Sequence, residues 1–163
     1  MKKSRIILTL ASLLLLLSIV LNLGGCMNSF ASDDLMKGVK ARSVTGKNSD
    51  DAFVLAQTEL ALKLFKASAN ESKNENVLIS PLSILLALAM TANGADNETR
   101  AEMEALLGGD IPLEELNEYI YTYVNSLPSS EKAKLEIANS IWFKDSESFK
   151  ANKDFLQTNA DYY

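Results

Sequence analysis

The chain has 163 residues, a formal net charge of −5 and no histidine, and 47% of its residues are hydrophobic. Without histidine these residues contain no Ser-His-Asp or Cys-His catalytic site, and they show no phosphate loop or metal-ligand cluster, so we expect neither an enzyme nor a cofactor. The acidic balance argues against a nucleic-acid partner, which needs clustered Lys and Arg. A single cysteine excludes an internal disulfide.

Residues 1–25 have the pattern of an export signal. Three basic residues within the first five precede a mostly apolar run over residues 6–23, and glycines follow at 24 and 25. A positive start, an apolar centre and a small-residue exit predict a signal peptide. The run is also just long enough to span a bilayer as an uncleaved helix.

The only cysteine, Cys26, directly follows that signal. Leu23-Gly24-Gly25-Cys26 resembles the lipobox of bacterial lipoproteins. In that family the cysteine is lipidated and the signal is cut just before it. The resemblance implies a lipid anchor at Cys26 on the outer face of a bacterial cytoplasmic membrane, and hence a membrane partner and an extracellular, cell-surface location. The alternative is an unmodified thiol beside an ordinary cleavage site.

Residues 26–50 connect this anchor to the remainder. They are rich in Ser, Asp, Asn, Lys and Gly and keep no sustained hydrophobic period. We expect a flexible linker there. The globular domain is then expected over residues 51–163.

Hydrophobic spacing predicts five helices in the globular part. Phe53, Ala56, Leu60 and Leu64 recur on one helical face. The expected helices cover residues 51–69, 81–93, 97–107 and 113–127, and a last one begins near Ser148.

The helix over 81–93 carries the clearest boundary signals. Ser80 can cap its first turn, Pro81 suits the first helical position, and Gly94 follows its end. Apolar side chains surround most of its circumference, so we expect it to be buried centrally.

Two segments predict strands. Residues 77–79 form a short apolar run, and Leu135, Ile137, Ile141 and Phe143 alternate with polar residues over 134–144. Trp142 is expected to pack between a sheet and a helix. Helices together with these strands predict an α+β fold.

Two motifs carry a family resemblance. The run from Asn76 to Ile84, followed by Gly94-Ala95, resembles the early signature of the serpins, and residues 138–143 resemble a strand of that family's large central sheet. The matching positions are Asn76, Ser80, Pro81, Ser83, Gly94, Ala95 and Asn139. The resemblance implies that residues 51–163 are the N-terminal, mostly helical part of a serpin domain.

The resemblance also implies a function. Serpins are inhibitors of serine, and sometimes cysteine, proteases: the protease cleaves an exposed reactive loop, which then inserts into the central sheet and traps it. That loop lies near the C-terminus of the family, so we expect residues 1–163 to be inactive alone. Ser80 and Ser83 match positions beneath the region where the sheet parts. The plainer interpretation is a helix cap and a first-turn serine.

Two other functions stay open: a non-inhibitory serpin-like binding module, and a degenerate, prematurely ended gene product. Some family members bind glycosaminoglycans through the helix corresponding to 113–127. Here Glu114, Glu115 and Glu118 occupy it without any Lys or Arg, which argues against such a ligand.

Overall fold

The computed structural model describes residues 34–72, 75–130, 135–144, 146 and 149–163. Residues 35–163 form one compact unit, and the description below concerns that unit. The predicted signal peptide and Cys26 lie outside the described residues. No helix in the described part is long and apolar enough to cross a membrane.

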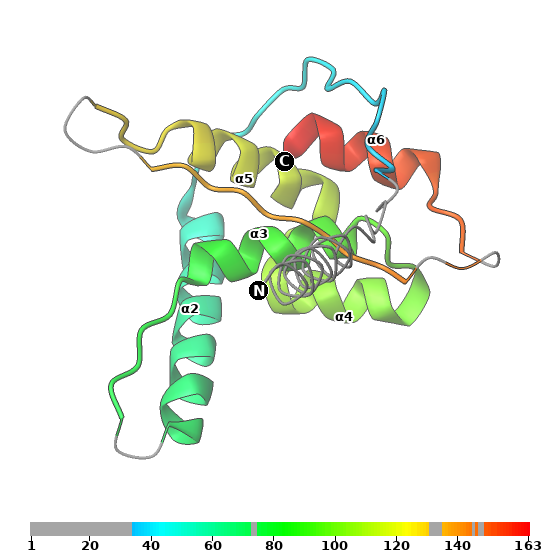
Figure 1. Cartoon of the computed structure of the whole chain (residues 1–163). Helices are drawn as coiled ribbons and strands as arrows, with labels where there is room; N and C mark the ends of the chain where they lie inside the picture. Colours follow the sequence, from blue (N-terminus) through cyan, green and yellow to red (C-terminus); the bar gives the residue numbers. More distant parts are fainter. Residues whose placement is uncertain (1–33, 73–74, 131–134, 145, 147–148) are drawn as a thin grey trace, which may run out of the picture. The chain divides into compact units, whose positions relative to one another are not determined.

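Among the described residues of this unit, five helices make up the regular structure (Figure 1). The first four helices are confirmed, with each end within two residues of its predicted position. The last helix begins at Lys153, five residues later than expected. Asn152 caps this last helix by accepting from the Asp154 N–H at 2.8 Å. The helices are α2 (Asp51–Glu71), α3 (Pro81–Ala92), α4 (Asn97–Leu107), α5 (Leu113–Asn125) and α6 (Lys153–Tyr162).

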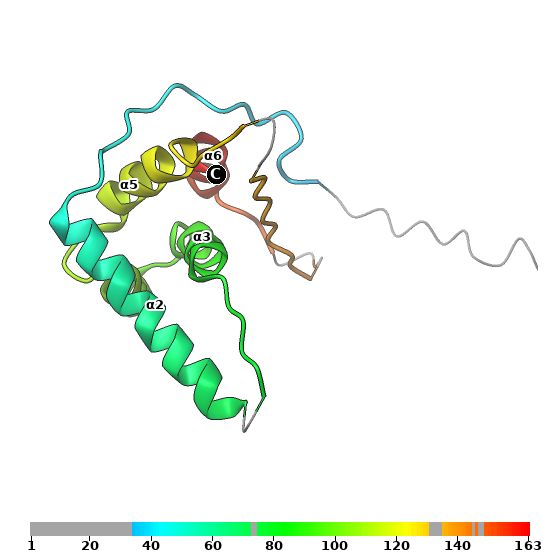
Figure 2. The ribbon, with the colours of Figure 1, turned by 90° about the vertical axis from the view of Figure 1, so that its left-hand side faces the viewer.

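Helix α3 lies among the other helices and contacts α2, α4 and α5 (Figure 2). One stripe of it is buried, namely Leu85, Leu86, Ala89 and Ala92. Leu82, Ile84, Leu88 and Met90 are half-buried, and Ala87 is exposed. The predicted central burial therefore holds for one face within the described part.

The hydrophobic core is shared by α2, α3, α4, α5 and the turn after α4. Burying apolar side chains there is the main source of stability for the unit. Its members are Phe53, Leu60, Leu85, Leu86, Ala89, Ala92, Leu107, Ile111, Leu113, Leu116, Tyr119 and Ile120. Among the described residues, α6 contributes none of these side chains.

Residues 40–47, which we call the strap, pack against α5 and α6 in an extended conformation. The Lys47 N–H donates to the Glu118 carbonyl at 3.1 Å, and the Gln157 side chain donates to the Lys40 carbonyl at 2.9 Å. Asp50 then caps α2 by accepting from the Phe53 N–H at 3.0 Å. The flexible linker expected over residues 26–50 stays a prediction, and within it residues 40–50 make these contacts with polar groups on α5 and α6.

The two segments predicted as strands are extended. Within the described residues, neither 77–79 nor 135–144 is paired into a sheet, so both strands stay predictions. Trp142 is 80% exposed and donates only to the Ser140 hydroxyl, at 2.8 Å. The expectation that it packs between sheet and helix is wrong in this structure, since no described element covers it.

Candidate functional site

The start of α3 brings Ser80 and Ser83 together. The Ser80 hydroxyl accepts from the Ser83 N–H at 3.4 Å, and the two hydroxyl oxygens lie 2.9 Å apart. Pro81 occupies the first helical position. The predicted cap is confirmed, and Ser80 keeps its side chain at the surface.

The end of α3 is fixed by a close approach of α6. A Cβ atom added at Gly94 would lie 2.9 Å from Cδ2 of Phe155, closer than two carbons normally approach. Glycine is therefore needed here for space. The neighbouring Ala95 N–H donates to the Ala92 carbonyl at 2.9 Å and closes the turn.

The other two signature residues lie apart from this helix start. Asn76 is exposed in the extended segment before α3. Asn139 lies on the extended segment 135–144 and lines a cavity beside α3. Six of the seven signature residues thus lie in one stretch of chain around α3, and Asn139 lies on a separate segment beside it.

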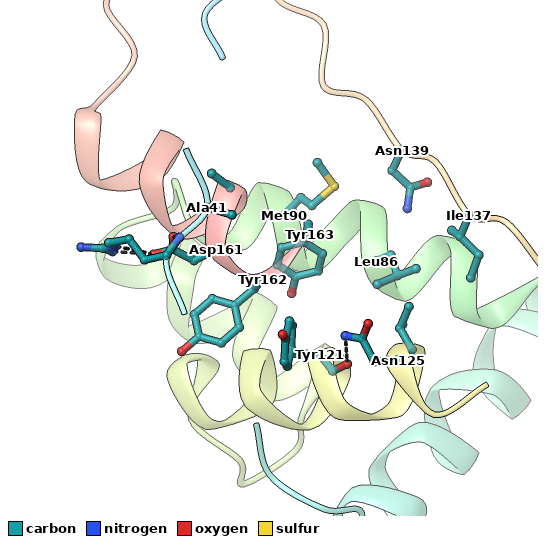
Figure 3. A pocket seen from close by; sticks show the side chains of 13 residues that line it. Ala41, Leu86, Met90, Tyr121, Asn125, Ile137, Asn139, Asp161, Tyr162 and Tyr163 are labelled. Carbon is teal, nitrogen blue, oxygen red and sulfur yellow. Dashed lines mark hydrogen bonds and ion pairs between the residues drawn. The ribbon is translucent and has the colours of Figure 1, made fainter. Parts of the chain in front are cut away.

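A cavity of about 330 Å³ lies between the strap, α3, α5, α6 and the segment 135–144 (Figure 3). Its apolar wall comes from Leu86, Met90, Val124 and Ile137, and its polar groups include Asn125 and Asn139. Tyr121 and Tyr162 stand at one side with their rings edge to face, at a centroid separation of 6.2 Å. The complete lining is Ala41, Arg42, Leu86, Met90, Tyr121, Val124, Asn125, Ile137, Asn139, Ala160, Asp161, Tyr162 and Tyr163.

The charged wall of this cavity is the ion pair of Arg42 and Asp161. The Arg42 guanidinium donates to Oδ2 of Asp161 through Nε at 2.9 Å and through Nη2 at 2.5 Å. The backbone N–H of Arg42 donates to Oδ1 at 2.7 Å. These bonds to its charged form hold the pKa of Asp161 down at about 2.

A second charged contact holds the other end of the strap. The Lys47 ammonium pairs with Glu115 and lies 4.6 Å from the ring centroid of Tyr119. The Tyr119 hydroxyl donates to Asp50, and its ring stacks on Phe53 at 4.9 Å between centroids. The hydrogen bond to Glu115, with Tyr119 alongside, raises the pKa of Lys47. The strap is therefore held by charge at both ends.

The chemistry available at the described side chains is hydrogen bonding and ion pairing. Across the described ranges, no three Cys, Asp or Glu side chains gather as a metal-binding group. Glu104 pairs instead with Arg100 at 3.1 Å and accepts from the Leu113 N–H at the start of α5 at 3.1 Å. Glu104 thus forms an ion pair and accepts a hydrogen bond at the start of α5.

Arg42, Asp161 and the buried amides of Asn117 and Asn159 are absent from the residues singled out by sequence. Arg42 and Asp161 are 119 positions apart, so no spacing pattern connects them. One signal for Asn159 and Asp161 was available in the sequence. Their helix has too few apolar residues to form a buried apolar face, which indicates that polar residues dock it.

The fold and the signature helix belong to a known family. The family model described as serpin (serine protease inhibitor) matches residues 55–163, more than half of the chain. The chain therefore belongs to the serpin family, whose members are in general protease inhibitors rather than enzymes.

Individual serpins are similar to this chain in sequence or in structure. Mouse neuroserpin is 31% identical over 127 residues, which are 74% of this chain and 28% of that protein. Human neuroserpin is 29% identical over 110 residues, which are 66% of this chain and 26% of that protein. The native state of tengpin, a thermophilic serpin, superposes with a TM-score of 0.74 at 56% identity, over 80% of this chain and 33% of that one. A loop C-sheet serpin polymer superposes with a TM-score of 0.71 at 57% identity, over 77% of this chain and 33% of that one. The chain thus spans about a quarter to a third of the length of these relatives.

Proposed function

We propose that the protein containing these residues inhibits a serine-type, or a related cysteine-type, endopeptidase by the serpin mechanism. The observation that carries the proposal is the family match over residues 55–163, together with the capped α3 and its Ser80–Ser83 contact. In this mechanism the protease cleaves a reactive loop, which inserts into the central sheet and traps the enzyme as an acyl-enzyme.

Residues 80–83 have a specific part in the proposal. Both serines are compact, and their hydroxyls lie side by side at the surface end of α3. Such a pair can bond to overlying strands and exchange partners as those strands part, without the bulk that would obstruct them. We therefore propose that Ser80 and Ser83 support opening of the sheet as well as capping α3.

The test is covalent trapping. A protein that continues these residues through the family's reactive loop should form an SDS-resistant complex with a serine protease. Residues 1–163 alone should form none, because they contain no counterpart of that loop. Absence of such a complex with every protease that cleaves the loop would reject inhibition and favour the non-inhibitory binding module. A complex formed by residues 1–163 alone would contradict the assigned position of the reactive region.

Ser83→Leu provides the matched test of the helix start. It keeps the Ser80 cap but adds bulk and removes one hydroxyl. The proposal expects more protease turnover per trapped enzyme with loop cleavage still fast. An unchanged ratio of loop cleavage to protease trapping would mean that Ser83 has no part in sheet opening and is only a first-turn residue of α3.

For the location, we propose a lipid anchor at Cys26 on the outer face of the cytoplasmic membrane. The support is the signal pattern over residues 1–25 and the position of the only cysteine directly after it. Cys26→Ala should abolish incorporation of radiolabelled palmitate, with Cys26→Ser as the nearest conservative control. Labelling that persists in both variants would contradict lipidation.

A further inference from the structure

Helix α6 is attached to the rest of the unit in an unusual way. Its two buried residues, Asn159 and Asp161, are both polar, and each is 6% exposed as a whole residue. Its apolar side chains Phe155 and Leu156 are only half-buried. A helix normally docks by burying an apolar stripe, so the docking of α6 depends on other interactions.

A chain of hydrogen bonds supplies the attachment to α3 and α5. The Tyr163 hydroxyl donates to Oδ1 of Asn117 at 2.7 Å, and Nδ2 of Asn117 donates to Oδ1 of Asn93 at 2.8 Å. Nδ2 of Asn93 donates in turn to Oδ1 of Asn159 at 3.3 Å. The Asn159 amide then donates to the Met90 carbonyl at 3.3 Å and to the Phe155 carbonyl at 3.0 Å.

The direction of these bonds matters. Each amide in the chain uses its oxygen to accept from one neighbour and its nitrogen to donate to the next, so the groups are satisfied only in one arrangement. Asn117 is 3% exposed, and an unpaired amide there would carry a desolvation cost. The network therefore specifies one position of α6 against the end of α3.

The opposite side of α6 is held by the strap. Asp161 accepts from Arg42, and Gln157 donates both to the Lys40 carbonyl at 2.9 Å and to Asp161 at 2.8 Å. Polar bonds thus hold both sides of the helix. The core made by α2 to α5 contains no α6 side chain among its described members.

We propose that α6 is a separately releasable element: it undocks as a unit when its polar bonds break, while α2 to α5 stay folded. Undocking α6 leaves the core closed, since α6 contributes none of its described members, and so exposes less apolar surface than opening the core does. The two events therefore have different free energies. Undocking moves residues 160–163 out of the cavity wall and opens the apolar face of Leu86 and Met90.

Native-state hydrogen exchange on the full chain, purified in detergent, tests this. The α6 amides should exchange through an opening that depends weakly on denaturant and leaves α3 and α5 protected. Tyr163→Phe removes one hydroxyl at nearly constant shape and should speed α6 exchange about fivefold. Asn159→Ala removes three hydrogen bonds and should speed it about tenfold or more.

Tyr162→Phe is the matched control. It makes the same chemical change one residue away, at a hydroxyl for which the structure describes no hydrogen bond, and α6 exchange should stay within about twofold of the parent. Equal acceleration in the two phenylalanine variants would overturn the role of the network. Exchange of α6 only together with α3 and α5 would overturn separate release.

Discussion

Arg42 and Asp161 join the strap to α6 through three hydrogen bonds on one carboxylate. The Asp161 side chain is 2% exposed, whereas that of Arg42 is 67% exposed. The carboxylate is therefore fixed in the protein, and the arginine reaches it from the surface. The short N–H···O distances of 2.5–2.9 Å are typical of charge-assisted bonds.

This pair predicts a defined dependence of stability on pH. The pKa of Asp161 lies at about 2 in the folded chain, below its ordinary value of 3.8. A carboxyl with a depressed folded pKa contributes stability above the unfolded pKa and loses it as the pH falls through the folded one. The stabilisation is therefore complete above about pH 4 and disappears between pH 4 and pH 2.

The measurement compares the parent with Asp161→Asn in urea at a series of pH values. The parent should unfold at higher urea near pH 7, and the difference should shrink between pH 4 and pH 2. Arg42→Ala should show the same convergence, and Arg42→Lys should lie between because it keeps one charge without the two-pronged geometry. A difference that stays constant down to pH 2 would assign the effect to packing.

The contact of Gly94 with Phe155 predicts a steric cost. In Gly94→Ala the added methyl would lie 2.9 Å from the ring, so α6 or the ring must shift. Overpacking of this kind destabilises by about 1–3 kcal/mol. Chemical denaturation of Gly94→Ala should show this loss.

The double variant Gly94→Ala/Phe155→Leu identifies the cause. Leucine lacks the ring atoms that the methyl meets, so the two changes together should cost less than the sum of the single changes. Strict additivity would mean that the ring is not what excludes a side chain at position 94.

The strap predicts a second close-packing effect. A methyl added at Gly46 would overlap the hydroxyl of Thr122 on α5. Gly46→Ala should therefore loosen residues 40–47 and raise their rate of cleavage in limited proteolysis, since extended segments are cut readily once released. Adding Thr122→Ala should restore the parent rate, and failure of that rescue would place the strap elsewhere.

The cap of α3 predicts a modest and specific loss. Ser80→Ala removes the oxygen that accepts from the Ser83 N–H and should destabilise the unit by about 1 kcal/mol in urea unfolding. Ser80→Asn keeps a capping oxygen and should stay close to the parent. Equal losses in the two variants would mean that the hydroxyl pair, and not the cap, carries the effect.

The helices could be predicted because their signals are local. The Ser80 cap, Pro81 and the spacing of Phe53 and Leu60 are written within a few residues of each other. The sequence predicts the start of α6 too early because Phe149 continues an apolar pattern that the chain does not use as helix. Its true cap, Asn152, is an ordinary capping residue in a polar stretch.

The strap and the amide network could not be predicted by such rules. Residues 40–50 have the composition of a linker, and only the partners supplied by α5 and α6 order them. Asn93, Asn117 and Asn159 likewise become a network only once three helices meet. Composition describes what a segment does alone and carries no information on distant partners.

Trp142 gives the segment 135–144 an intrinsic optical label. It is the single tryptophan of the chain, and at 80% exposure its indole is surrounded by water. Its fluorescence emission should lie at long wavelength in the folded chain and change little when the core of α2 to α5 melts. A shift to shorter wavelength would instead report that another surface has covered this segment, so covering and unfolding can be followed separately in one sample.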